Sequence, residues 1–97
     1  MKRMMLNLEV LHRDSSFNNG RIRDSFRTIP LSINTSSIIS ISPVRQAIRE
    51  VNGKNADNLK FTEITYALGP TVEKVLVIGD YHNLVERVQA SRRLLNG

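Results

Sequence analysis

The side chains best suited to chemistry in this sequence are arginines grouped around an Asn-Gly pair at residues 19–20. Side chains on a strand alternate between two faces, so the three arginines that follow this pair, at residues 21, 23 and 27, point the same way. Guanidinium groups on one face suit phosphate binding, and a phenylalanine among them suits stacking on a nucleic-acid base. This candidate nucleic-acid or anion contact consists of Arg13, Arg21, Arg23, Phe26 and Arg27.

Two structural roles for these arginines stay open as alternatives. Charged side chains protect the exposed edge strand of a sheet, and ion pairs with Asp14 and Asp24 would neutralise the arginines. The distribution of charge favours an anionic partner, because residues 1–49 hold eight Lys/Arg and three Asp/Glu, a net +5, whereas residues 50–97 hold six of each. The sequence has no RNA-recognition aromatic motif and no helix-turn-helix spacing, so phosphate contact is expected rather than base-specific recognition.

Patterns that indicate catalysis or metal binding are missing from the sequence. It contains no cysteine, which excludes disulfides, thiolate metal sites and cysteine nucleophiles. His12 and His82 each lack a second ligand at helical spacing, and the five glycines are isolated and form no phosphate-binding loop. Glu63 and Glu73 are expected on paired strands, but on an exposed face where both are solvated. We therefore predict no catalytic, cofactor-binding or metal-binding residues, no cofactor and no enzymatic activity.

Alternation of apolar and polar residues predicts that most of the chain is β-strand. It is clearest at residues 29–33, where Pro30 lacks an N–H and indicates an edge strand or a bulge. Asn19-Gly20 favours a tight hairpin turn, with a mobile loop as the alternative. The predicted strands lie near residues 5–11, 21–33, 38–41, 61–68 and 73–78.

Two of these strands depart from simple alternation. Phe61 is out of phase with the residues that follow it, which suggests a bulge or a strand that begins at Thr62. The consecutive apolar residues Val75, Leu76, Val77 and Ile78 indicate burial on both faces, as in a central strand.

Helical periodicity predicts two helices. A short helix near residues 43–52 follows from the spacing of Val44, Ala47, Ile48 and Val51, with Gly53 as its stop signal. A second helix over residues 80–95 is expected to begin with Asp80 as its N-cap. The predicted fold is therefore α+β, with a small antiparallel sheet of about five strands and two helices in one domain over residues 1–97. Residues 13–28 and 43–58 are expected to be mobile or functional loops.

Some apolar residues have no obvious place in the core, and they predict an interface between copies of the chain. Ile29 and Leu31 lie on the expected edge strand, while Leu94 and Leu95 lie beyond the apolar stripe of the last helix. Small chains gain buried area by association. No apolar run is long enough for a membrane span, and no secretion signal follows the basic first residues, so a cytoplasmic location is expected.

From Ile29 onward the hydrophobic pattern resembles that of the small FlbD-type flagellar proteins of bacteria, over residues 29–95. The residues that carry the resemblance are 34–41, 62–66 and 75–80, which lead into 84–88, while residues 43–58 depart from the pattern. The resemblance implies a small non-catalytic protein of a regulatory or assembly type. The sequence thus predicts a regulatory or assembly module that acts through protein–protein contacts as a homo-oligomer. The alternative is a nucleic-acid-binding regulator that uses its basic N-terminal half.

Overall fold

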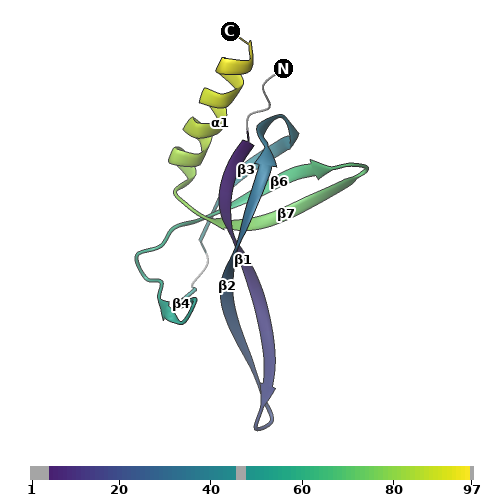
Figure 1. Cartoon of the computed structure of the whole chain (residues 1–97). Helices are drawn as coiled ribbons and strands as arrows, with labels where there is room; N and C mark the ends of the chain where they lie inside the picture. Colours follow the sequence, from purple (N-terminus) through teal and green to yellow (C-terminus); the bar gives the residue numbers. More distant parts are fainter. Residues whose placement is uncertain (1–4, 46–47, 97) are drawn as a thin grey trace.

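The computed structural model describes residues 5–45 and 48–96, and the side chains of the C-terminal helix as far as Arg92. A five-stranded antiparallel sheet has the order β2-β1-β7-β6-β3, a small hairpin pairs β4 with β5, and one helix covers part of the sheet (Figure 1). The elements are β1 (Met5–Asn18), β2 (Arg21–Asn34), the single 3₁₀ turn η1 (Thr35–Ser37), β3 (Ile38–Val44), β4 (Glu50–Val51), β5 (Lys54–Asn55), β6 (Phe61–Leu68), β7 (Thr71–Ile78) and α1 (Tyr81–Asn96). The predicted antiparallel sheet and C-terminal helix are confirmed, and the fold is mainly β.

The first two strands form one long hairpin with an uninterrupted register. Pairing runs from Met5 opposite Asn34 to Asn18 opposite Arg21. Asn19 and Gly20 have φ angles of 53° and 76°, and two positive φ angles define the type I′ turn, which matches the twist of the flanking strands. The predicted hairpin turn is therefore present, and residues 13–28 form the two strands beside it.

Strand β7 lies at the centre of the sheet, and its two faces contribute to two different cores. Val75 and Val77 pack into the core beneath the helix, whereas Leu76 and Ile78 pack into a second core on the other face. The predicted central strand is confirmed. Phe61 is paired with Ile78 and is buried in the second core. It is out of phase with Ile64 and Tyr66 because it points to the opposite face of the sheet, and no bulge is needed to explain it.

The helix closes the first core. Asp80 caps it, because its Oδ2 accepts a hydrogen bond from the Asn83 N–H at 3.3 Å. Arg92 Nη2 also donates to the carbonyl of Ile38 at 3.1 Å, which ties the helix to the beginning of β3. This core consists of Leu6, Leu8, Ile33, Ile38, Ile64, Tyr66, Val77, Leu84 and Val88.

The short helix predicted near residues 43–52 is wrong. Pro43 and Val44 belong to the edge strand β3, opposite Thr62 and Phe61, and Val51 belongs to β4. The apolar residues with helical spacing do not form one face of a helix. Ile48 and Val51 instead pack, together with Ala56, around Phe61 in the second core. Asn52 and Gly53 have φ angles of 55° and 74°, so this Asn-Gly pair forms a hairpin turn like the first one. Gln46 and Ala47 lie outside the described residues.

Gly79 connects the central strand to the helix in a conformation that suits glycine. Its φ is +151°, its N–H donates to the carbonyl of Lys60 at 2.8 Å, and a Cβ there would lie 3.2 Å from Leu84 Cδ1. Leu84 is buried in the first core, so it has little space to move away. A side chain at Gly79 would therefore strain both the backbone and the packing beneath the helix.

We predict that Gly79→Ala destabilises the protein more than Gly69→Ala does. Gly69 also has a positive φ, of +59°, but a Cβ there meets no atom within 4 Å. The Gly69 variant is expected to lose about 1–2 kcal/mol from backbone strain alone, and the Gly79 variant about 1 kcal/mol more from overpacking against Leu84. Urea unfolding of both variants measures the difference, and equal losses would contradict the role assigned to the Leu84 contact.

Candidate functional site

The most distinctive feature of the molecule is the outer half of the β1–β2 hairpin, which we call the hairpin arm (residues 13–26). β1 pairs with the central strand β7 at Val10, opposite Val77. Beyond that point the two strands leave the sheet as a ribbon that projects away from the helix (Figure 1). The molecule is accordingly elongated, with principal extents of 57, 31 and 18 Å.

The turn of the small hairpin β4–β5 holds the base of the hairpin arm through Asn52. Its backbone N–H donates to the carbonyl of Phe26 at 2.9 Å, and its Oδ1 accepts from the N–H of Thr28 at 3.0 Å. Its Nδ2 also donates to Thr28 Oγ1 at 2.9 Å. Asn52 thus binds the outer edge of β2 where a further strand would otherwise pair.

The same contacts show what Pro30 does at that edge. Backbone polar groups of an antiparallel strand point alternately toward and away from the partner strand, and Phe26 and Thr28 present theirs outward to Asn52. Pro30 is the next residue in this outward series, so its missing N–H costs the β1–β2 pairing nothing and deprives any further strand of a donor. β2 is at the edge of the sheet, as the proline predicted.

The interface residues predicted from the sequence have different surroundings. The side chain of Ile29 is 37% exposed, whereas Leu31 is half-buried against the first core. Strand pairing through this edge is disfavoured by Pro30. The side chains of Leu94 and Leu95 lie outside the described part of the chain.

The register divides the predicted basic set between the two faces of the hairpin arm. Arg21, Arg23 and Arg27 lie on one face, as predicted, opposite Asn18, Ser16 and His12 respectively. Arg13 and Phe26 face each other across the strands on the other face. Phe26 also packs against the second core, so the structure does not bring its ring together with the three arginines.

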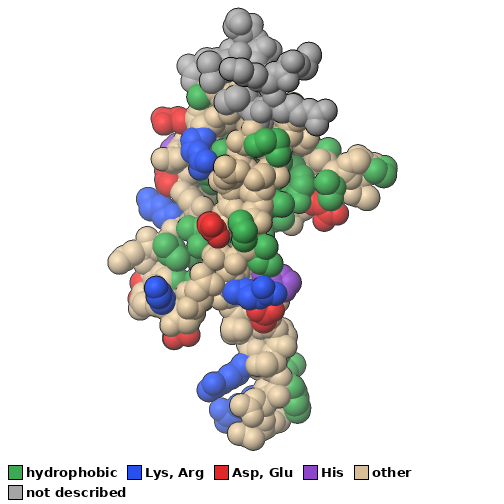
Figure 2. All heavy atoms as spheres, viewed as in Figure 1, with side chains coloured by type: hydrophobic (Ala, Val, Ile, Leu, Met, Phe, Trp, Pro, Cys, Tyr) green, Lys and Arg blue, Asp and Glu red, His purple; other side chains and the backbone are tan. Residues whose placement is uncertain are grey.

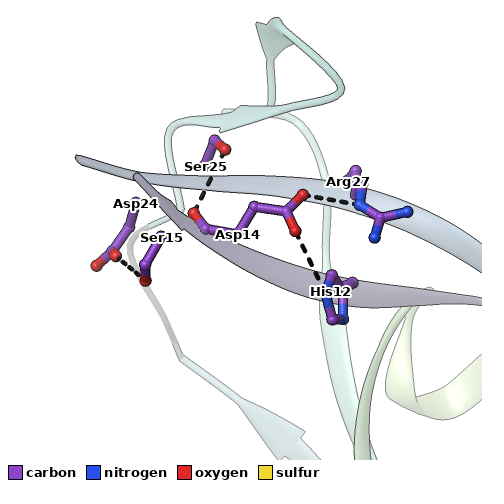
Figure 3. Close-up of polar contacts among 6 residues, drawn as sticks. All are labelled: His12, Asp14, Ser15, Asp24, Ser25 and Arg27. Atoms are coloured by element: carbon purple, nitrogen blue, oxygen red, sulfur yellow. Dashed lines mark hydrogen bonds and ion pairs between the residues drawn. The ribbon is translucent and has the colours of Figure 1, made fainter. Parts of the chain in front are cut away.

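Two of the four arginines are neutralised by the carboxylates of the hairpin arm, and Figure 3 shows the contacts of one of them, Arg27. Arg27 Nε lies 2.7 Å from Asp14 Oδ2, and His12 Nε2 lies 3.3 Å from Asp14 Oδ1. On the opposite face, Arg13 pairs with Asp24, which also accepts a hydrogen bond from Ser15 Oγ at 2.9 Å. The hydrogen bonds from Arg13 and Ser15 lower the pKa of Asp24. Ion pairing therefore accounts for Arg13 and Arg27.

Arg21 and Arg23 differ from the other two, because among the described residues neither side chain forms an ion pair. With Asn18 and Asn19 they line a hollow of about 390 Å³ at the end of the hairpin arm. Two unpaired guanidinium groups and two amides are suited to bind a phosphate or another oxyanion.

The opposite face of the arm end carries an apolar pair that was not predicted from the sequence. Phe17 and Ile22 are directly opposite each other, and their side chains are 76% and 72% exposed. Basic and hydrophobic side chains accordingly lie on opposite sides of the end of the arm (Figure 2). The poor alternation before Phe17 concealed this pair, although the Asn-Gly turn, which fixes the register, was a signal that could have revealed it.

A second group of exposed apolar side chains was also not predicted and lies at the far end of the β6–β7 hairpin. Leu68 is 58% and Val72 61% exposed, and Ile39, 58% exposed, lies in a bulge of β3 next to the pairing of Ile38 with Tyr66. Leu68 pairs with Thr71 and Val72 pairs with Ala67, so Leu68 and Val72 lie on opposite faces of this end of the hairpin. We call Ile39, Leu68 and Val72 the sheet-end patch, which extends over both faces of the end of the sheet. Hydrophobic side chains gather along the projection that β6 and β7 form (Figure 2).

Glu63 and Glu73 lie on paired strands, as expected, but they do not share a face of the sheet. Glu63 is opposite Leu76 and Glu73 is opposite Tyr66, which places the two carboxylates on opposite faces of the sheet. In the part of the chain that the structure describes, no group of three His, Asp or Glu side chains could hold a metal ion. No described helix is long and apolar enough to cross a membrane.

Comparison of the chain with protein-family models, with curated proteins and with solved structures found no match.

We predict that Asn52→Gly loosens the base of the hairpin arm without changing the turn. Glycine keeps the positive φ and the backbone N–H that binds Phe26, but it removes both side-chain hydrogen bonds to Thr28. The amide of Thr28 should exchange with solvent roughly tenfold faster, since each such bond contributes about 0.5–1.5 kcal/mol. Hydrogen exchange measures this effect, with the amide of the buried Val77 as an internal control. Unchanged protection of Thr28 would mean that Asn52 does not hold the arm.

We also predict that Arg13→Gln raises the pKa of Asp24 toward its ordinary value, whereas Arg27→Gln leaves it unchanged. Because the folded-state pKa is lowered, this ion pair stabilises the arm above the ordinary carboxylate pKa of about 3.9 and is lost as the pH falls through the lower folded value. Titration of the Asp24 carboxyl carbon by NMR in both variants provides the measurement. Equal midpoints in the two variants would contradict the pairing.

Proposed function

We propose that the protein is a small non-enzymatic assembly or regulatory module that acts through protein–protein contacts and associates with copies of itself. The observation that carries this proposal is the sheet-end patch, where Ile39, Leu68 and Val72 are each more than half exposed. Single exposed apolar residues are common on protein surfaces. These three lie at one end of the sheet, with Leu68 and Val72 on opposite faces, so a partner that covers this end would bury apolar side chains on both faces.

The position of the sheet-end patch supports association there rather than through the outer edge of β2. The register places Leu68 on the face of the first core, two residues beyond the buried Tyr66, so it extends the apolar surface of that core outward. At the β2 edge, by contrast, Asn52 and Pro30 disfavour strand pairing. The interface proposed here therefore differs from the contact predicted at Ile29 and Leu31.

The role proposed here is also the one implied by the resemblance to FlbD-type flagellar proteins. The residues that carry that resemblance include β6, β7 and the first part of α1, the elements that build the first core and position Leu68 and Val72. The hairpin arm lies entirely outside residues 29–95 and is not required for this role.

We expect the protein to sediment as a concentration-dependent oligomer and Leu68→Thr/Val72→Thr to shift it toward monomer. Truncation of a residue at the centre of an interface costs about 1–2 kcal/mol or more, which weakens association roughly tenfold per site. Sedimentation velocity over a range of concentrations provides the measurement. Threonine favours strands, and both residues are exposed, so folding should be preserved.

The matched control is Phe17→Thr/Ile22→Thr, which removes an even more exposed apolar pair from the hairpin arm. This variant is expected to associate like the unmodified protein. A monomer at every concentration would contradict the proposed function. An oligomer that only the control variant disrupts would move the interface to the arm.

A further inference from the structure

The end of the hairpin arm, which we call the arm tip (residues 17–23), presents two chemically different faces within one thin ribbon. One face carries Arg21 and Arg23 beside Asn18, and the other carries Phe17 opposite Ile22. Side chains on the two faces of such a ribbon are separated by about 10 Å, the thickness of one sheet layer. Neither face is covered, because all five residues are exposed to solvent.

Internal pairing concentrates the positive charge of the arm at its tip. The carboxylates of Asp14 and Asp24 are engaged by Arg27 and Arg13 nearer the body of the protein. These ion pairs leave Arg21 and Arg23 as two net positive charges at the far end. If these arginines served only to keep an edge strand from pairing with another strand, there would be no reason for those at the tip to lack ion pairs while those nearer the body form them.

The hollow on the basic face can accept a phosphate group. It is an open hollow of about 390 Å³, and the residues that line it, Asn18, Asn19, Arg21 and Arg23, all carry guanidinium or amide donors. Arginine suits phosphate because its planar donors bind two oxygens at once. The amides provide further donors at the edge of the turn.

A ligand that uses both faces must surround the ribbon or cross its end. The major groove of DNA is about 12 Å wide and admits a two-stranded ribbon, with phosphates along its walls and base edges at its floor. In proteins that bind the minor groove, exposed Phe and Ile side chains act as wedges between base steps, and a Phe ring also stacks on the bases of single strands. A polynucleotide therefore matches the charged face and the apolar face together.

We propose that the arm tip is a polynucleotide-binding site, in which Arg21 and Arg23 hold backbone phosphates while Phe17 and Ile22 contact the bases. The site goes beyond the proposed self-association, since it lies on a different surface from the sheet-end patch. It also differs from the basic set predicted from the sequence, because Arg13, Arg27 and Phe26 are engaged within the protein itself.

Fluorescence anisotropy of labelled single-stranded and duplex DNA, measured across a salt series, tests this site. Two phosphate contacts predict that log K falls with log salt with a slope of about −1.8 for duplex and about −1.4 for single strands. Four contacts from the whole basic set would give a slope of about −3.6 for duplex instead. The form of DNA that binds more tightly identifies whether the ligand is paired or unpaired.

Three double variants separate the parts of the site. Arg21→Gln/Arg23→Gln should remove most of the binding and its salt dependence, since each phosphate contact contributes about 1 to the slope. Phe17→Thr/Ile22→Thr should weaken binding but keep the slope. Arg45→Gln/Lys74→Gln is the matched control, because it removes the same charge from exposed positions away from the arm, and it should bind like the unmodified protein.

Several outcomes would overturn the proposal. Absence of binding at low salt excludes the site, and equal weakening by the control variant shows a general charge effect. Displacement of DNA by poly-glutamate, with no effect of the Phe17 and Ile22 changes, would identify an acidic polypeptide as the ligand instead. Sedimentation of the same variants shows whether self-association is retained, so failure of this site is distinguishable from failure of the proposed function.

Discussion

The structure depends above all on the register of the β1–β2 hairpin, which a two-residue turn determines. Asn19 and Gly20 both adopt positive φ, and pairing continues from that turn to the opposite end of both strands without a shift. A slip of one strand by one residue would turn all of its side chains to the opposite face of the ribbon. It would move Leu6 and Leu8 out of the core at one end and would also mix the basic and apolar faces at the other. The core and the arm tip therefore share a single constraint.

The outer half of this hairpin projects from the body of the protein because the two small cores, on opposite faces of the sheet, contact only its inner and middle parts. The inner half supplies Leu6, Leu8 and Ile33 to the core beneath the helix, and the middle supplies Leu11 and Phe26 to the core beneath the β4–β5 hairpin. Between Phe26 and the tip of the hairpin, no residue of the ribbon belongs to either core of the described chain. The backbone pairing of the two strands then holds the ribbon together, with the turn and the cross-strand ion pairs as additions. Such a ribbon is stable mainly because its base is anchored.

Separation of the two proposed surfaces has a functional consequence. The sheet-end patch lies mainly on the β6–β7 hairpin, and the arm tip lies at the end of the β1–β2 hairpin. Association of two copies through the sheet-end patch would therefore leave the arm tips accessible to a ligand. An oligomer would then present several arms to one polynucleotide. Two arginines alone bind weakly, but linked sites gain affinity through their effective concentration. Assembly and polynucleotide binding would in that case be two parts of one role.

Local chemistry determined where the five strands of the main sheet lie, although not their full lengths and not the β4–β5 hairpin. It also determined that the first Asn-Gly pair is a hairpin turn, that Pro30 lies at an edge, that β7 is central and that Asp80 caps the last helix. These features depend on backbone geometry and on periodicity within a few residues. Tertiary structure decided the rest, because residues far apart compete for the same partners. Val51 has helical spacing with its neighbours, yet it packs against Phe61 in the second core, because burial against a residue distant in the sequence outweighs the local helical pattern. Arg13 and Arg27 look as available as Arg21 and Arg23 in the sequence, but only the cross-strand register shows which arginines meet a carboxylate and which remain unpaired.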